Sequence, residues 1–388
     1  MYRWRQLMPF APVTLSPGQE RLRTEVREFM ARELPRGSYR PGLGMNADAS
    51  PAFSRKLAER GWVGMTIPAA YGGHGLGPVE RFIVVEELLA AGAPVGAHWI
   101  ADRQTGPTIL AYGTEEQRRR FLPAIARGEC YFSLGMSEPD AGSDLAAVRT
   151  AATRVPGGWS LTGSKIWTSG AHRNHFFAVL CRTSPLGPDR HEGLSQLLVD
   201  LSAPGLTISP VPLLDGSHHF NQVVFDEVFV ADDMVLGEVG SGWSQVTSEL
   251  SYERSGPDRF LSSWLLLETF VREHADGSGP PGLPATIGKL TARFWAIRQL
   301  SLSVASALEA GRGAPVEAAM VKDLGTVFEQ EVAAVMHEAL GYDPLPESSS
   351  LFESLLAQAL LVAPSYTIRG GTTEVLRTVA ARALESSR

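Results

Sequence analysis

A chain of 388 residues is longer than one hydrophobic core usually supports, so its length alone predicts two or three domains. A hydrophobic content of 44% and a charged content of 20% are typical of globular proteins and exclude a largely disordered chain. The net charge of -7 argues against general nucleic-acid binding, and 2 cysteines cannot form a disulfide framework or a cysteine-based zinc site.

No segment of the sequence predicts export or a membrane anchor. The start, MYRWRQLMPFAP, is basic but has no continuous apolar core of signal-peptide length. No run reaches the roughly 18 apolar residues of a membrane span. We therefore expect a cytoplasmic protein that binds neither membranes nor nucleic acid, and we expect no metal site.

The first third of the chain, from Ser16 to about Ala126, predicts helices. Apolar residues recur there at helical spacing, as in segments 22–30 and 82–89. The breaks fall at PRGSYRPGLG and IPAAYGGHGLGP, which are rich in the glycine and proline that turns favour. These features indicate an N-terminal helical domain over residues 1–126.

Between Tyr131 and about Val235 the pattern changes to short runs rich in valine, phenylalanine, leucine and threonine. The runs include YFSLGMS, WSLTGSKIWTS and HFFAVLCRT, and turns separate them roughly every ten residues. Such spacing predicts an antiparallel β domain, a barrel or a sandwich, over residues 127–238.

After the segment GEVGSGW the helical period returns and continues to the C terminus. Interruptions at ADGSGPPGLP and GYDPLPESSS separate the helices of a bundle over residues 239–388. The predicted fold class is therefore a multi-domain α+β protein with helices, then a sheet, then helices. This order carries no chemistry by itself, so motifs must supply the function.

Two segments of the sheet region place hydroxyl groups at the ends of predicted strands. Residues 131–144, YFSLGMSEPDAGSD, run from a strand into a loop of small residues, and residues 163–170, GSKIWTSG, repeat the arrangement with a tryptophan. Serine, proline and glycine are common in turns, and tryptophan is usually a core residue, so a structural role is open for each segment. Together they suit a flat heteroaromatic ring, which needs a stacking surface and donors aimed at its edge.

The segments SEPDAGSD and KIWTSGA resemble the two flavin-binding signatures of the acyl-CoA dehydrogenase family. The resemblance extends in order and spacing to GWVGMTIPAAYGGHGLG, FDEVFVADDMVLGEVGSGW and IRGGTTEVLRTVAARAL, and so covers nearly the whole chain. It implies an N-terminal helical domain, a middle β domain and a C-terminal four-helix bundle. It also implies FAD as the cofactor and the oxidation of an acyl-CoA to a trans-2-enoyl-CoA, with electrons passed to an electron-transfer flavoprotein.

The resemblance assigns cofactor roles residue by residue. Ser137 would meet the pyrimidine edge of the flavin, and Trp167 would pack against the isoalloxazine ring. Thr168 and Ser169 would donate hydrogen bonds near flavin N5 and O4. Thr372 would also contact FAD, although a helix N-cap role is equally compatible with the sequence. The positions expected to bind the cofactor are Leu134, Met136, Ser137, Gly142, Ser143, Trp167, Thr168, Ser169, Thr372 and Glu374.

The catalytic base is displaced from its commonest place in the family. Many members carry a catalytic glutamate just before the Gly-Thr of the C-terminal motif, where this chain has Gly370. A second group carries the base in a Glu-Arg pair on the first helix of the C-terminal domain, which implies Glu253 as the base here and Arg254 as its helper. Glu253 shares a helical face with an apolar stripe, Trp243, Val246 and Leu250.

The resemblance also implies how the substrate is held. The backbone N–H of Gly370 would stabilise the thioester enolate in place of a side chain. The residues expected to contact the substrate are Ser143, Ser251, Arg254 and Arg369. Pro257, one turn after the base, is expected to kink the helix and alter the acyl cavity, but the sequence does not identify the acyl group.

Two family segments that hold the ADP half of FAD in a neighbouring subunit are altered. The Arg-x-x-Phe-Gly region reads ATIGKLTARFWAIRQL, and the Gln-x-x-Gly-Gly region reads MHEALGYDPLPESSS, without a glycine pair. Either Arg293, Arg298 or Gln299 replaces these contacts, or a related chain of another sequence supplies them. The protein is accordingly expected to be a homo-oligomer, as a dimer or tetramer, or a hetero-oligomer.

Three other functions compete with a complete acyl-CoA dehydrogenase. A flavin oxidase or monooxygenase of the same fold would pass the electrons to oxygen. A subunit of a heteromeric dehydrogenase would hold only part of the FAD site. A silent member would bind only nucleic acid or only a partner protein. The net charge of -7 argues against nucleic-acid binding.

Overall fold

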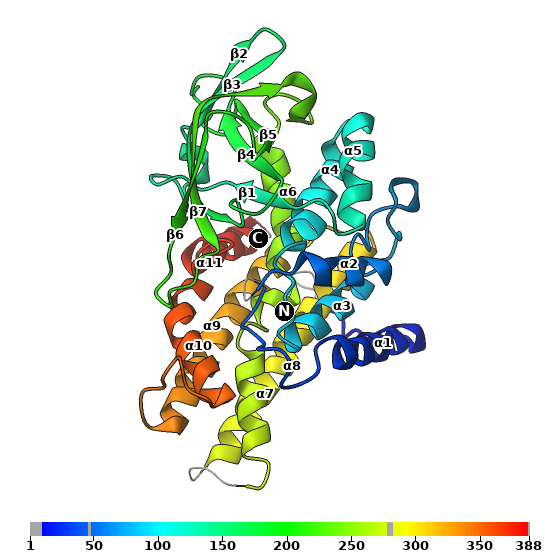
Figure 1. Cartoon of the computed structure of the whole chain (residues 1–388), viewed down its shortest axis with the longest axis vertical. Helices are drawn as coiled ribbons and strands as arrows, with labels where there is room; N and C mark the ends of the chain where they lie inside the picture. Colours follow the sequence, from blue (N-terminus) through cyan, green and yellow to red (C-terminus); the bar gives the residue numbers. More distant parts are fainter. Residues whose placement is uncertain (1–9, 46–47, 278–281, 387–388) are drawn as a thin grey trace. The chain divides into compact units, whose positions relative to one another are not determined.

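The computed structural model describes residues 10–45, 48–277 and 282–386, without the side chains of residues 249–253, 384 and 386 (Figure 1). The chain forms two compact units. The helical unit comprises the described parts of Met1–Asp48, Gly77–Pro94 and Leu250–Arg388. The sheet unit comprises Ala49–Leu76 and Val95–Glu249.

The helical unit is built around one long helix. α9 packs against α8, α10 and α11, and α3 packs against α1 and α8. The segments of this unit are α1 (Pro17–Glu33), α3 (Pro78–Ala90), η6 (Pro257–Arg259), α7 (Trp264–Glu273), α8 (Leu283–Glu309), α9 (Pro315–Leu340), α10 (Leu351–Tyr366) and α11 (Thr373–Ser386).

Local sequence signals fix where these helices begin and end. α1 begins with a capping box, in which the Ser16 side chain accepts from the backbone N–H of Gln19 and the Gln19 side chain accepts from that of Ser16. α9 ends at Leu340 because Gly341 adopts a left-handed conformation with φ 78°. The segment GYDPLPESSS that follows is therefore a connection to α10, as its composition predicts.

The sheet unit begins with helical segments and continues as one sheet. The helical segments are α2 (Pro51–Glu59), η2 (Ala69–Tyr71), η3 (Ala101–Thr105), α4 (Gly106–Tyr112) and α5 (Glu115–Ala126). The remaining segments are β1 (Phe132–Gly135), η4 (Leu145–Ala147), β2 (Ala151–Val155), β3 (Gly158–Ser169), β4 (Phe176–Arg182), β5 (Leu194–Asp200), β6 (Leu206–Val211), β7 (Phe220–Ala231), η5 (Asp232–Met234) and β8 (Val235–Leu236).

The strands follow the order β6-β7-β3-β2-β4-β5-β8, with β1 paired to β4 (Figure 1). Most neighbours are antiparallel, as the turn spacing predicts, but β1 and β2 each pair with β4 in parallel. Parallel strands need a crossover connection, and the segment between β1 and β4, which includes the β2–β3 hairpin, supplies it. The residue pattern within one strand does not indicate which strand it pairs with or in which direction.

Apolar side chains from α5 and from the sheet form one core. Phe121 of α5 meets Phe132 of β1 and Phe176 of β4 edge to face, with ring centroids 5.5 and 5.1 Å apart. β4 is buried along five consecutive residues, so both of its faces are covered. This core anchors the strand ends that carry the two flavin-like segments.

α6 (Gly242–Arg254) follows the sheet and ends immediately after Glu253. Pro257 lies beyond the helix, in η6, so the expected kink within a helix is wrong. A proline that follows a helix end prevents its continuation instead of bending it.

The order of helices, sheet and helices is confirmed. The domain limits at residues 126 and 238 stay predictions, and the first helices divide between the two units. Within the part of the chain that the structure describes, no helix combines the length and apolarity that crossing a membrane requires.

Candidate functional site

The C-terminal end of β3 presents a large aromatic side chain to the surface. The register between β3 and β7 shifts between Lys165 and Thr168, which displaces the intervening residues from the ladder. Trp167 adopts φ 60° and its side chain remains 52% exposed, with Phe220 packed edge to face at 5.8 Å. A bulky residue in this left-handed conformation costs on the order of 1–3 kcal/mol, and such strain concentrates at functional sites.

The next two residues are held by their main chain. The carbonyl of Thr168 accepts from Asn221 Nδ2 at 3.0 Å, and that of Ser169 accepts from Ser133 Oγ at 2.8 Å. Thr168 is fully buried, yet its hydroxyl has no hydrogen-bond partner among the described residues. A buried polar group without a partner is uncommon, and a ligand that accepts a hydrogen bond would satisfy it.

The loop after β1 is joined to β3 through a buried ion pair. Lys165 Nζ contacts Glu138 Oε1 at 2.8 Å and donates to the carbonyl of Met136 at 3.0 Å. The Ile166 N–H donates to the carbonyl of Ser137 at 3.0 Å. The two flavin-like segments, remote in sequence, therefore form one connected piece of the sheet unit.

Burial and neighbouring groups shift the pKa values of both partners of this ion pair. Burial would raise the pKa of Glu138, but the Lys165 ammonium and the N–H groups of Arg149 and Thr150 more than compensate and leave the pKa of the carboxyl below its usual value. Burial lowers the pKa of Lys165, and Glu138 opposes that shift. Sequence reasoning missed the pair, although the alternation along β3 places Lys165 on the same inward face as Leu161.

The remaining predicted positions of the sheet unit lie around this piece. Leu134 and Met136 are half-buried, and Gly142 and Ser143 are exposed. A Cβ added at Gly142 would meet nothing within 4 Å. The loop is held nearby by an ion pair between Asp144 and Arg190 at 2.6 Å. The exposed part of this loop is open to a ligand.

The second group of predicted positions lies in the helical unit, around Gly370. Gly370 and Gly371 have φ of 67° and 97°, a pair of conformations that only glycine adopts without strain. Arg254 is buried, and its Nε donates to the carbonyl of Gly370 at 3.2 Å. The structure thus brings together the end of α6 and Gly370. The side chains of Glu253 and Ser251 lie outside the described residues.

Thr372 and Glu374 lie at the beginning of α11. The hydroxyl of Thr372 accepts from the Val375 N–H at 3.4 Å, the geometry of an N-cap. Glu374 is exposed, and hydrogen bonds from its own backbone and from the Thr372 hydroxyl lower the pKa of its carboxyl. Both side chains remain accessible, so their cofactor roles stay predictions.

Arg369 is engaged inside the helical unit. Its Nη2 donates to Ser262 Oγ at 2.7 Å and lies 3.4 Å from Glu329 Oε2, and its guanidinium lies over the Tyr366 ring at 4.9 Å. Burial raises the pKa of Glu329, and the charge of Arg369 opposes that shift. These partners give Arg369 a structural role, and its contact with substrate stays a prediction.

The candidates for the ADP half of FAD also have partners within the helical unit. Arg298 forms a bidentate ion pair with Glu86 at 2.6 and 2.8 Å, and Arg293 pairs with Glu331. Gln299 Nε2 donates to the carbonyl of Val13 at 3.2 Å. Each of these side chains therefore already has a partner within the helical unit.

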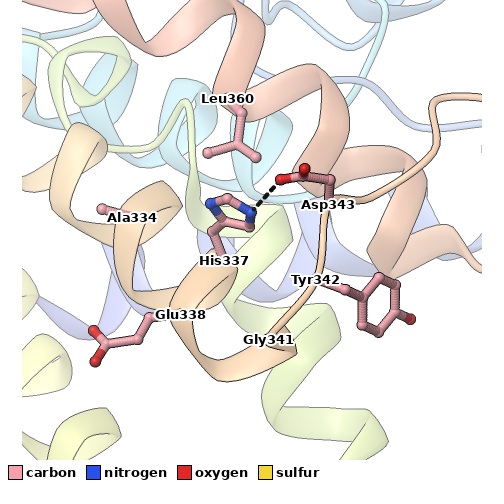
Figure 2. Close-up of a pocket in the computed structure, with 7 residues that line it drawn as sticks. All are labelled: Ala334, His337, Glu338, Gly341, Tyr342, Asp343 and Leu360. Atoms are coloured by element: carbon pink, nitrogen blue, oxygen red, sulfur yellow. Dashed lines mark hydrogen bonds and ion pairs between the residues drawn. The ribbon is translucent and has the colours of Figure 1, made fainter.

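An open surface depression lies where α9 meets the following loop, the region that lacks the family's glycine pair. Figure 2 shows Glu338 projecting from α9 and His337 facing Asp343, with Nε2 and Oδ1 3.1 Å apart. The depression is lined by Ala334, His337, Glu338, Gly341, Tyr342, Asp343 and Leu360. Two carboxylates in this lining disfavour a diphosphate.

Comparison with known proteins agrees with these features. Models of the N-terminal, middle and C-terminal acyl-CoA dehydrogenase domains match residues 16–129, 133–228 and 278–385. The acyl-CoA dehydrogenase FadE29 of Mycobacterium tuberculosis is 34% identical over 386 residues, covering 94% of this chain and 96% of that protein.

Two solved structures extend the similarity to the fold. The "Tcur3481-Tcur3483 steroid ACAD" has a TM-score of 0.85 at 28% identity, covering 97% of this chain and 98% of that chain. The ChsE4-ChsE5 complex from Mycobacterium tuberculosis has a TM-score of 0.82 at 28% identity, covering 97% and 99%. The chain therefore belongs to the acyl-CoA dehydrogenase family of FAD-dependent oxidoreductases.

Proposed function

We propose that this chain oxidises a CoA thioester at its α and β carbons to a trans-2-enoyl-CoA and passes the electrons to an electron-transfer flavoprotein. The observation that carries the proposal is the hydrogen bond from Arg254 to the carbonyl of Gly370. It holds the residue next to Glu253 against the glycine that occupies the usual position of the base. This contact supports Glu253 as the base in this chain.

The residues of the sheet unit fit a flavin. Trp167 offers a half-exposed indole, and Thr168 offers a buried hydroxyl that has no partner among the described residues. A side-chain atom added at Gly142 would meet nothing within 4 Å, so space is open beside that loop. A flavin ring needs a stacking surface and hydrogen-bond donors at its edge, and these residues supply both. Bound FAD supplies the acceptor for the hydride that leaves the β carbon.

Each residue then has a defined task. Glu253 removes the α proton, and the N–H of Gly370 polarises the thioester carbonyl as negative charge develops on its oxygen. Arg254 fixes the position of Gly370 through the carbonyl of that residue. The proton and the hydride together account for the two hydrogens that the acyl group loses.

We expect Trp167→Ala to weaken FAD binding, because the indole supplies the stacking surface beside the flavin. Stacking of an aromatic side chain on a planar base is worth roughly 1–3 kcal/mol, so the dissociation constant should rise about 5- to 150-fold. Fluorescence titration of apoprotein with FAD measures this change. Trp295→Ala is a matched control, since Trp295 is 56% exposed and lies on α8 of the other unit. Equal FAD affinity in the Trp167 variant and the parent would contradict the stacking role.

We further propose that a subunit of different sequence completes the ADP half of the FAD site. Arg298 and Arg293 are engaged within this chain, and Glu338 and Asp343 line the depression that follows α9. Of the similar structures named above, one is the ChsE4-ChsE5 complex and the other carries the double name Tcur3481-Tcur3483. These observations favour a heteromer over a homo-oligomer with two equal sites.

The FAD-loaded protein should therefore exceed the 41.9 kDa of one chain in light scattering, and full loading should require the second chain. We expect the chain alone to lose FAD during gel filtration and to retain it when co-purified with a related chain of different sequence. A 41.9 kDa species that holds a full complement of FAD would exclude this arrangement.

A steroid-derived acyl group is the substrate class that we propose for the first test, because one similar structure is titled a steroid enzyme of this family. The experiment mixes FAD-loaded protein anaerobically with CoA thioesters and records the flavin absorbance. Bleaching followed by slow reoxidation in air supports a dehydrogenase. Rapid peroxide formation in air would instead assign an oxidase, and no bleaching by any thioester would reject the proposed activity.

A further inference from the structure

Lysine is scarce in this chain, and half of its lysines are buried. The lysines are Lys56, Lys165, Lys289 and Lys322. Lys56 and Lys289 are exposed, whereas Lys165 and Lys322 have no exposed surface. Burying an ammonium group is unfavourable unless partners compensate for its lost hydration. Lys165 is compensated by Glu138. Among the described residues Lys322 forms no comparable ion pair, so a different reason for its burial is needed.

The partner of Lys322 is the main chain of the glycine turn. Its Nζ donates to the carbonyl of Gly371 at 2.7 Å, across 49 residues of sequence. Arg254 donates to the preceding carbonyl, that of Gly370, at 3.2 Å. Two consecutive carbonyls therefore each receive a hydrogen bond from a basic side chain, and the two side chains come from different helices, α6 and α9.

This arrangement controls the direction of the peptide groups in the turn. The N–H of a trans peptide points away from its carbonyl, so holding the carbonyls of Gly370 and Gly371 also orients the N–H groups of Gly371 and Thr372. Adjacent glycines have the widest choice of backbone conformations, and φ values of 67° and 97° are only one of many combinations open to them. The turn therefore depends on external contacts for a single conformation.

Contacts other than that of Lys322 hold the helices around the turn. Removing the lysine should therefore affect the turn without removing these helix contacts. Arg377 of α11 pairs with Asp323 of α9 at 3.0 Å, beside Lys322 in sequence. Glu329, two turns further along α9, accepts from the Ser262 N–H at 2.7 Å. Neither contact reaches the carbonyl of Gly371, so the lysine acts specifically on the turn.

The surroundings of Lys322 disfavour its charged form. Burial, followed by the nearby guanidinium groups of Arg259 and Arg369, lowers the pKa of Lys322 to about 7, against the opposing effect of Glu329 and Asp323. Both the ammonium and the neutral amine carry N–H donors, so Lys322 can donate to the carbonyl of Gly371 in either form.

We propose that Lys322 is a positioning residue that, together with Arg254, holds the Gly370–Gly371 turn in the conformation that the reaction requires. The inference rests on the proposed function, in which the Gly370 N–H polarises the thioester carbonyl. This N–H belongs to the peptide group just before the two that are held, so the contacts act on it through the conformation of the turn at Gly370. Lys322 contacts neither substrate nor flavin in this account. It acts through the turn, so its loss should slow the reaction more than it weakens binding.

The test compares Lys322→Met with Thr326→Val. Methionine keeps the length and apolar stem of lysine without a donor. Thr326 is a matched control because it is equally buried, lies one turn further along α9 and donates only to the Lys322 carbonyl of its own helix, at 2.8 Å. Two measurements are made on the full holoenzyme: hydrogen exchange of the segment 367–377, and the limiting rate of anaerobic flavin reduction together with the apparent substrate dissociation constant.

For Lys322→Met we expect exchange in segment 367–377 to accelerate at least about tenfold and the limiting rate to fall about 10- to 100-fold, since one misplaced donor in an oxyanion site costs this order. The substrate dissociation constant should change less than about threefold. Thr326→Val should match the parent in both measurements. If Lys322→Met does not fold, Lys322→Gln takes its place, with a smaller change of the same sign.

Parental exchange in segment 367–377, or an equal loss of rate in Thr326→Val, would overturn the proposal. So would a loss that appears only in substrate affinity. The exchange measurement does not depend on turnover. If no CoA thioester reduces the parental flavin, the proposed function fails while the exchange still decides whether Lys322 holds the turn.

Discussion

Glu253→Gln is expected to slow anaerobic flavin reduction by about 10²- to 10⁴-fold, roughly 3–5 kcal/mol of barrier, because glutamine keeps the size of the side chain but cannot accept the proton. Binding of the CoA thioester should change little, since the amide retains the polarity of the acid. Stopped-flow spectroscopy of the flavin band under substrate saturation measures the effect.

The matched control for this variant is Glu238→Gln, which makes the same exchange at an exposed position shortly before α6. It should reduce flavin at the parental rate. A parental rate in Glu253→Gln itself would show that the proton leaves by another route, and the proposed mechanism would have to be abandoned.

Moving the base to its commoner position should rescue Glu253→Gly only in part. A glutamate at position 370 could face the same substrate carbon from a different backbone segment. The φ of 67° at Gly370 imposes a left-handed conformation on the new residue, at a cost of about 1–2 kcal/mol. We therefore expect Glu253→Gly combined with Gly370→Glu to recover activity over Glu253→Gly alone, without reaching the parental rate.

Lys165→Met is expected to lower the free energy of unfolding by about 3–5 kcal/mol, because it leaves the buried Glu138 carboxylate without its countercharge. Adding Glu138→Gln should recover part of the loss, because glutamine removes the unpaired charge and its single oxygen can still accept from one of the two N–H groups, that of Arg149 or that of Thr150. Urea unfolding followed by tryptophan fluorescence compares the variants. Lys56→Met, at an exposed position, should match the parent.

The loss of unfolding free energy in Lys165→Met should also depend on pH. The pKa of Glu138 lies below its ordinary value in the folded parent, so this group contributes stability above the unfolded value that is lost as pH falls through the folded value. The difference in unfolding free energy between parent and Lys165→Met should therefore shrink below about pH 4. A deficit that stays constant from pH 7 to pH 3.5 would argue against the ion pair as its cause.

The sequence predicted the features of this protein that depend on local pattern. Helical spacing located α1 and α3, and turn spacing located the strands, because burial of one face leaves a period in the chain. The resemblance of SEPDAGSD and KIWTSGA to flavin signatures led to the strand end that carries Trp167. Its left-handed conformation and its exposure became visible only in the structure.

The contacts that hold the site together could not be read from the sequence, since they join residues that no local period relates. Lys165 meets Glu138 across 27 residues, and Lys322 meets Gly371 across 49. A lysine within an otherwise apolar helix face is normally interpreted as solvated, and its burial follows from tertiary packing. The parallel pairing of β1 with β4 is equally non-local.

The most direct test of the proposed activity is to follow flavin absorbance and thioester product together. FAD-loaded protein, with its partner chain where required, is mixed anaerobically with straight-chain, branched, aromatic and steroid-derived acyl-CoA thioesters. The account predicts that at least one class bleaches the flavin and yields a trans-2-enoyl-CoA in an amount equal to the flavin reduced. Absence of bleaching across all classes, or bleaching without an unsaturated thioester, would contradict it.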